Sequence, residues 1–149
     1  MAMPSHEWLC RTIVDNAPDA MIFADREGII RLWNAGAEAM FGYKKEEALG
    51  KSLDLIVPDP FRIRHWEGYR RVMATGETKY GKDLLSVPGV RKDGARISLD
   101  FSIVMVRDEE GRMMGTAAVL RDVTARWKKD KELKERFSAL EAELKKRGA

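Results

Sequence analysis

The residues best suited to chemistry lie in one stretch, residues 61–72, which reads FRIRHWEGYRRV. Wound as a helix of about 100° per residue, this stretch separates a charged face from an apolar arc made of Phe61, His65, Gly68, Tyr69 and Val72. His65 stands near the middle of that arc, where a solvated histidine is not expected. Two interpretations of His65 are open. It is either a core residue or a histidine that binds a metal, with Gly68 leaving space beside the imidazole for a flat ligand. Arg71, at the edge of the arc, could meet an acidic group on such a ligand.

Length and composition limit the classes of protein to consider. The chain has 149 residues, which is the size of one domain with one modest core. It has no apolar run near the roughly 18 residues that a membrane span needs, and its first six residues lack a signal-peptide pattern. The single cysteine, Cys10, excludes a disulfide framework and a cysteine-built metal site. We expect a reduced, cytoplasmic protein that does not enter a membrane.

The net charge of +3 does not indicate nucleic-acid binding, because of where the charge lies. Residues 124–149 carry nine Lys and Arg against five Asp and Glu, so residues 1–123 have a net charge of −1. In the basic segment, charges of both signs alternate, which is typical of a solvated helix face rather than of a phosphate-binding surface.

The first half of the chain predicts short helices around one hairpin. Residues 5–16 predict a helix that packs on another part of the protein. Residues 21–25 and 28–34 predict a hairpin, since the polar turn 25–28 ends in glycine. Asn34 is expected to cap a helix over residues 35–41 that Gly42 ends, and residues 44–50 predict another helix. A Pro-Asp-Pro breaker at residues 58–60 then precedes the helix of His65, which ends near Gly76.

The second half predicts strands. Residues 80–87 predict one strand, followed by a turn at Val87-Pro88-Gly89. Residues 96–106 alternate with period two, and their apolar face is made of Ile97, Leu99, Phe101, Ile103 and Met105. The turn 108–111 leads to a last strand over residues 113–121. Because no long crossover joins the last three strands, we expect an α+β fold with a five-stranded antiparallel sheet and helices on one face.

The C-terminal segment predicts a coiled-coil-like helix. Leu133, Phe137, Leu140 and Leu144 step by 4, 3 and 4 residues, a seam of under two heptads. Pairs spaced i,i+4, such as Asp130 with Lys134, support the helix. Such a stripe needs a partner, which could be the protein's own sheet or a second copy; we favour a homodimer.

Five segments together resemble a PAS domain: residues 16–20 (NAPDA), 33–43 (WNAGAEAMFGY), 46–50 (EEALG), 91–94 (RKDG) and 121–124 (RDVT). The resemblance runs from about residue 8 to 126. It implies an N-terminal helical cap over residues 1–16, a PAS sensor domain over residues 17–124 and a C-terminal signalling and dimerisation helix over residues 125–149. PAS domains are sensory and dimerising modules, so the fold alone does not identify a ligand.

Within that family, the chain is similar to the haem-binding oxygen sensors of histidine kinases and cyclic-dinucleotide phosphodiesterases. The resemblance implies haem b with His65 as the iron ligand, and Tyr69 and Val72 beside it on the same helix. Arg71 falls where the kinase-type sensors have an arginine near a haem propionate. Phe101 and Ile103 fall on strand positions that form the apolar distal wall.

The distal side departs from these sensors. Leu85 stands where they have an oxygen-stabilising arginine, and Asp83 where the phosphodiesterase type has a methionine ligand. Leu85 offers O₂ no hydrogen bond, and the polarity of the distal side decides what haem iron does. We therefore expect sensing of CO, NO or redox state to be at least as well supported as sensing of O₂.

Other chemistries find little support. The sequence has no Walker loop, no HExxH motif and no cysteine inside the domain, which excludes a flavin–cysteine photosensor. Trp33, Trp66 and Trp127 are interpreted as packing residues. We expect a sensor without enzymatic activity that passes its signal through the C-terminal helix to a partner protein or a fused effector. The alternative is a cofactor-free PAS module for dimerisation or signal relay, with His65 in its core.

Overall fold

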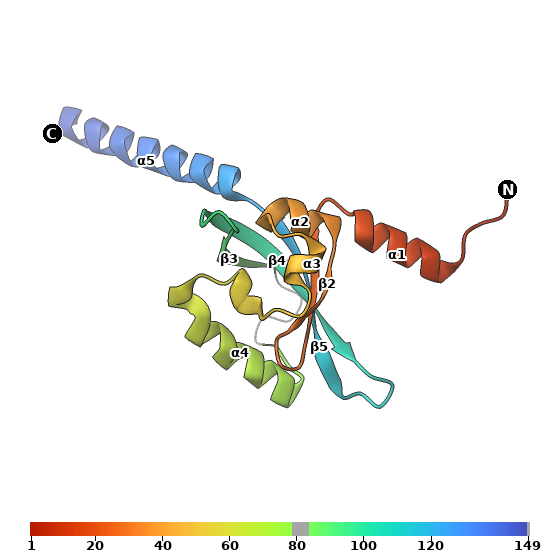
Figure 1. Ribbon diagram of the computed structural model, residues 1–149. Helices are drawn as coiled ribbons and strands as arrows, with labels where there is room; N and C mark the ends of the chain where they lie inside the picture. The colour runs from red at the N-terminus through yellow and green to blue at the C-terminus, as the bar shows by residue number, and fades with distance from the viewer. Residues whose placement is uncertain (79–83, 149) are drawn as a thin grey trace.

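The computed structural model of the protein describes residues 1–78 and 84–148. Within them, five strands form one antiparallel sheet in the order β2-β1-β5-β4-β3 (Figure 1). The strands are β1 (Ala20–Asp25), β2 (Ile30–Trp33), β3 (Leu85–Val90), β4 (Arg96–Arg107) and β5 (Met113–Asp122). The predicted α+β architecture is confirmed.

The helices between β2 and β3 gather on one face of the sheet. They are α2 (Ala35–Phe41), α3 (Lys45–Ala48) and α4 (Arg62–Thr75), with single 3₁₀ turns at Leu53–Leu55 and Asp59–Phe61 before α4. Phe41 and Ala48 belong to the same buried cluster as Ile22 and Leu99 of the sheet; α2 contacts β1, and α3 contacts the edge strand β2. The inner face of the sheet and these helices enclose the core.

Asn34 holds the start of α2 as predicted, and it does more than cap a helix. Its side chain is buried; its Oδ1 accepts from the amides of Ala37 at 2.9 Å and Met21 at 2.8 Å. Its Nδ2 donates to the carbonyls of Val14 at 2.8 Å and Asp19 at 3.0 Å. One amide side chain therefore ties together the end of α1 (His6–Asn16), the start of β1 and the first turn of α2.

The strand predicted over residues 80–87 corresponds to β3, which covers Leu85–Val90. Its predicted start, residues 80–83, lies outside the described residues, and the predicted turn at Val87-Pro88-Gly89 is wrong, because β3 continues to Val90. Pro88 is tolerated since β3 is an edge strand, where a missing amide proton need not break a ladder. A Cβ at Gly89 would lie 2.7 Å from Cδ1 of Leu99, so a larger residue there would force the Leu99 side chain to shift.

The two terminal helices leave the sheet in opposite directions (Figure 1). Helix α1 contacts α2 but has no buried residue, so the predicted packing of this helix is slight. Helix α5 (Thr124–Arg147) begins directly after β5, and every residue from 125 to 148 is exposed. The stripe of four apolar residues on α5 therefore does not fold back onto the sheet. Trp127, predicted to pack, is exposed because it lies on this projecting helix.

Candidate functional site

Helix α4 turns one face towards the sheet. That face carries His65, Trp66, Tyr69, Val72 and Met73, spaced so that i, i+4 and i+7 fall in one stripe. The helix ends at Gly76, which has φ of 69° and whose amide donates to the carbonyl of Val72 at 2.8 Å. The predicted arc is thus right for His65, Tyr69 and Val72, but Phe61 precedes the helix and is partly exposed.

The predicted role of Gly68, to leave space beside the imidazole for a flat ligand, stays a prediction. A Cβ built at Gly68 meets nothing within 4 Å, so this position is open whatever its residue. On this helix, the residue that closely approaches a glycine is Trp66. A Cβ on Gly28, in the turn between β1 and β2, would lie 2.1 Å from the ring of Trp66, and φ of 77° also favours glycine there. Gly28 therefore makes room for α4 itself.

Two aromatic residues anchor α4 by hydrogen bonds. The indole N–H of Trp66 donates to Oδ1 of Asp54 at 2.7 Å. The hydroxyl of Tyr69 faces the carbonyls of Ala24, at 3.1 Å, and Asp25, and its single proton is shared between them. Burial raises the pKa of Tyr69, so the hydroxyl stays protonated and remains a donor. The inner stripe of α4 is thereby fixed against β1.

His65 lies in this aromatic setting with an unused nitrogen. Its ring centroid is 4.8 Å from that of Trp66, edge to face, and 5.9 Å from that of Tyr69. Its Nδ1 is buried and has no hydrogen-bond partner among residues 1–78 and 84–148. Burial lowers the pKa of His65, although the nearby Asp54 carboxylate opposes this effect. The result is a neutral imidazole with a free donor or acceptor position, the form in which histidine binds metals.

The other predicted ligand-contacting residues are spread over α4, β3 and β4. Leu85 is half-buried and directly opposite Phe101 in the β3–β4 ladder, and Ile103 is opposite Ala118 in the β4–β5 ladder, all on the inner face. Val72 packs at the edge of the cluster formed by Tyr69 and Met73. Arg71 is exposed on α4, and Asp83 lies outside the described residues.

A small apolar cavity of about 50 Å³ lies on the inner face of the sheet. Its described lining comes from β1, β5 and the segment before α4: Ile22, Ala24, Leu53, Ile56, Thr116, Ala118 and Leu120. Cofactor pockets usually measure about 300–1,000 Å³. The described cavity is therefore much smaller than a usual cofactor pocket, and its described lining includes no residue of α4.

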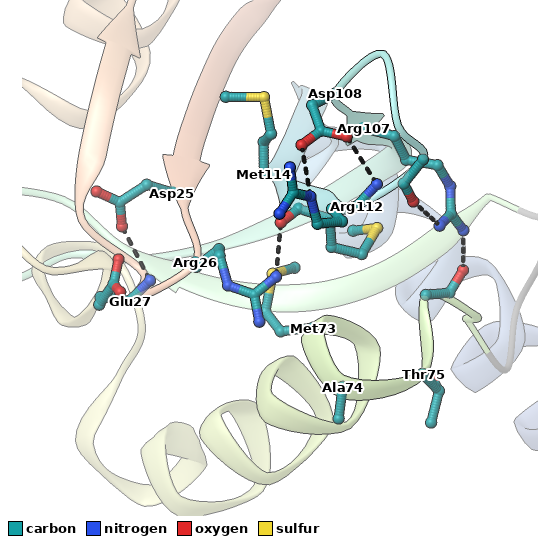
Figure 2. Close-up of a pocket in the computed structure, with 13 residues that line it drawn as sticks. Asp25, Arg26, Glu27, Met73, Ala74, Thr75, Arg107, Asp108, Arg112 and Met114 are labelled. Atoms are coloured by element: carbon teal, nitrogen blue, oxygen red, sulfur yellow. Dashed lines mark hydrogen bonds and ion pairs between the residues drawn. The ribbon is translucent and has the colours of Figure 1, made fainter.

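A larger hollow, which sequence reasoning missed, lies at the other end of α4 (Figure 2). We call it the hairpin cleft; it measures about 790 Å³ and is lined by residues 25–27, 73–76, 107–108 and 111–114. Its walls come from the β1–β2 turn, the end of α4 and the β4–β5 hairpin. The only sequence signal was the presence of arginines beside both predicted hairpin turns.

The sequence matches the family described as PAS fold over residues 14–128. The chain belongs to the PAS family. The fold agrees: a PAS domain from Colwellia psychrerythraea superposes with a TM-score of 0.71 at 23% identity, covering 81% of this chain and 99% of that one. An RNA-binding light-oxygen-voltage receptor superposes with a TM-score of 0.72 at 20% identity, covering 93% of this chain and 41% of the receptor.

Two signalling proteins are among its relatives in sequence. The sensor protein FixL of Bradyrhizobium diazoefficiens is 34% identical over 102 residues, which is 68% of this PAS chain and 20% of FixL. The cell-division control histidine kinase PdhS of Brucella ovis is 30% identical over 131 residues, which is 88% of this chain and 12% of PdhS. The chain thus spans a fifth or less of the length of these relatives. In the part of the chain that the structure describes, no helix is long and apolar enough to cross a membrane.

Proposed function

We propose that this PAS domain binds haem b through His65 and senses a diatomic gas (O₂, CO or NO) or the redox state of the iron. The observation that carries the proposal is the neutral, half-buried imidazole of His65, whose buried Nδ1 has no partner in the described structure. An unpaired buried polar atom is costly unless something satisfies it. The resemblance to haem-binding PAS sensors supplies the ligand that suits this position.

The surrounding residues support an apolar, planar ligand. Tyr69 and Val72 would border it on α4, and Leu85, Phe101 and Ile103 would face it from the sheet. Arg71 would stay near solvent, where its guanidinium can pair with a propionate. Haem supplies a redox-active iron that takes a diatomic ligand, and the polarity of the protein wall tunes its preference. Leu85 would place on that wall an apolar side chain that has no hydrogen-bond donor.

The small volume of the site means that haem binding would require α4 to move. Since the described cavity measures about 50 Å³, haem binding requires the inner stripe of α4 to move away from β1 and β5. The anchors that resist this movement are the hydrogen bonds of Trp66 and Tyr69. The same small cavity favours the second candidate, a cofactor-free PAS module in which His65 is a core residue.

The output would pass through α5. This helix continues directly from β5, and its exposed stripe of Leu133, Phe137, Leu140 and Leu144 suits pairing with a second copy. We propose a homodimer that transmits the state of the sensor to a partner protein or a fused effector. The module itself would have no enzymatic activity and would work in the cytoplasm.

Haem titration of matched histidine variants tests the proposal. His65→Ala should abolish stoichiometric haem binding, followed by the absorption band near 400 nm, while the far-UV circular dichroism stays that of the wild type. His6→Ala is the control: it removes the other histidine of the chain, which is exposed on α1. Haem occupancy of His65→Ala equal to that of the wild type would eliminate His65 as the ligand, and a wild-type protein that takes up no haem would favour the cofactor-free module.

A further inference from the structure

The small cavity on the inner face of the sheet lies apart from the residues that we assign to haem. It measures about 50 Å³, and its walls are β1, β5 and the segment before α4, which contributes Leu53 and Ile56. No residue of the proposed haem site belongs to its described lining. This space, which we call the sheet cavity, is therefore present while α4 is packed against β1, and it does not depend on any movement of that helix.

Two alanines leave this space open. Ile22 of β1 is directly opposite Ala118 of β5, and Ala24 is opposite Thr116, so the two alanines are diagonal neighbours on the inner face. An alanine fills the volume of only one methyl group, whereas protein cores are otherwise close-packed, with few voids larger than a water molecule. Larger side chains at these two positions would fill the cavity, so the choice of Ala24 and Ala118 sets its volume.

The walls of the sheet cavity favour an apolar guest over water. Six of its seven described lining residues are apolar, and the hydroxyl of Thr116 is the only polar side-chain group among them. A buried water usually makes about three hydrogen bonds, so one hydroxyl satisfies it poorly. Apolar cavities instead take up small apolar molecules such as xenon, which are held by dispersion contacts with the wall.

The volume limits the guest to a very small molecule. One water needs roughly 10–15 Å³, and cofactor pockets measure about 300–1,000 Å³. The sheet cavity, at about 50 Å³, has room for about two or three non-hydrogen atoms and not for a ring or a chain. Diatomic gases have two atoms and little charge separation, so they lose little when they leave water for an apolar space.

We propose that the sheet cavity binds a diatomic gas molecule, O₂, CO or NO, directly and without iron. The guest contacts Ala118 and Leu120 from the sheet and Leu53 and Ile56 from the segment before α4. The site goes beyond the proposed function, because it exists in the haem-free chain and applies equally to the cofactor-free module. Since β5 runs directly into α5, an occupant touches the strand that continues into the proposed output helix (Figure 1).

Xenon titration of the full chain in its haem-free form, with ¹³C-labelled methyl groups, tests this site. Xenon is an apolar probe small enough for such a cavity. The methyl signals of Ile22, Leu53 and Ala118 should shift with one common affinity, whereas those of the exposed Val104 should not shift. Dissolved O₂ under pressure is the second probe; it is paramagnetic and should speed the relaxation of the same methyl groups.

Matched variants locate the guest. Ala118→Val fills the cavity and should weaken xenon binding about tenfold or more. Ala117→Val is the control, because it adds the same two methyl groups one position earlier on β5, where the side chain faces the other side of the sheet; it should bind xenon as the wild type does. Ile56→Val removes one methyl group from the wall and should tighten xenon binding about two- to fivefold.

Four results would overturn the proposal: no saturable xenon shifts in the wild type, shifts centred away from the sheet cavity, xenon binding without any effect of O₂ on the same methyl groups, or equal affinity in the wild type, Ala118→Val and Ile56→Val. The gain expected for Ile56→Val keeps the test valid where Ala118→Val does not fold. Because these measurements use the haem-free chain, their outcome is independent of the haem titration, and the two proposals can fail separately.

Discussion

Replacing Asn34 by alanine should be among the most destabilising single changes that leave the proposed ligand sites untouched. The side chain is 1% exposed and makes four hydrogen bonds of 3.0 Å or shorter. Each such bond contributes about 0.5–1.5 kcal/mol net, and backbone groups left buried without partners add to the loss. Allowing for water that enters the vacated space, we expect the free energy of unfolding to fall by about 3–5 kcal/mol, a large part of the usual 5–15 kcal/mol.

Urea unfolding followed by circular dichroism measures this loss. With a slope of about 2 kcal/mol/M, the midpoint should fall by roughly 1.5–2.5 M at unchanged slope. Ser52→Ala is the matched control, since Ser52 caps a turn through one bond of 3.1 Å to the amide of Asp54 and should cost about 1 kcal/mol. If Asn34→Ala loses no more than Ser52→Ala, the network around Asn34 does not hold the N-terminal segment as argued.

Three further predictions concern the distal wall, the C-terminal helix and the response to acid. In the haem-loaded protein, Leu85→Arg should slow O₂ dissociation by about ten- to a hundredfold with little effect on CO, as flash photolysis measures; equal O₂ rates would mean that Leu85 does not face the iron. Removing the residues after Ala125 deletes the apolar stripe of α5 and should shift the protein towards monomer in sedimentation velocity, whereas an unchanged dimer would place the interface on α1 or the sheet. Burial opposes ionisation of Asp25, but its bonds with Arg31 and the amides of Ile29 and Glu27 outweigh this and lower its pKa below the ordinary 3.8. The stabilisation that Asp25 provides is thus complete above pH 3.8 and is lost as the pH falls through the lowered pKa. In Asp25→Asn, the free energy of unfolding measured with urea should depend less on pH in this acidic range. An unchanged pH dependence would contradict the assignment.

Local patterns predicted most of the fold because they act through neighbouring residues. Asn34 and Gly42 bracket α2 as capping chemistry requires, and the period-two apolar face of β4 points inwards along its length. The errors arise where tertiary packing decides. Pro88 and Gly89 signal a turn in isolation, yet they lie within β3 because this strand is at the edge and Leu99 needs the space above Gly89.

The candidate sites also contain some features that local patterns predict and others that only tertiary packing decides. Helical spacing was enough to place His65 and Tyr69 together on the inner face of α4. It could not show that Trp66 also turns inwards, since its partner Gly28 lies 38 positions earlier in the chain. The hairpin cleft was out of reach for the same reason: Arg26 and Arg107 come together only when the β1–β2 turn and the β4–β5 hairpin meet at the end of α4.

The pairing of β1 with β5 bears on how such a module can be moved between proteins. Ala20, at the start of β1, is directly opposite Leu120, near the end of β5, and the side chain of Arg121 bonds that of Asp19 at 3.0 Å. The chain therefore enters and leaves the sheet at adjacent points, while α1 and α5 run away from each other (Figure 1). A domain with this geometry can be inserted into a long helix, or cut out of one, with little change in the separation of the flanking segments. Recombination could thus add a sensor to an existing signalling helix without redesigning either part.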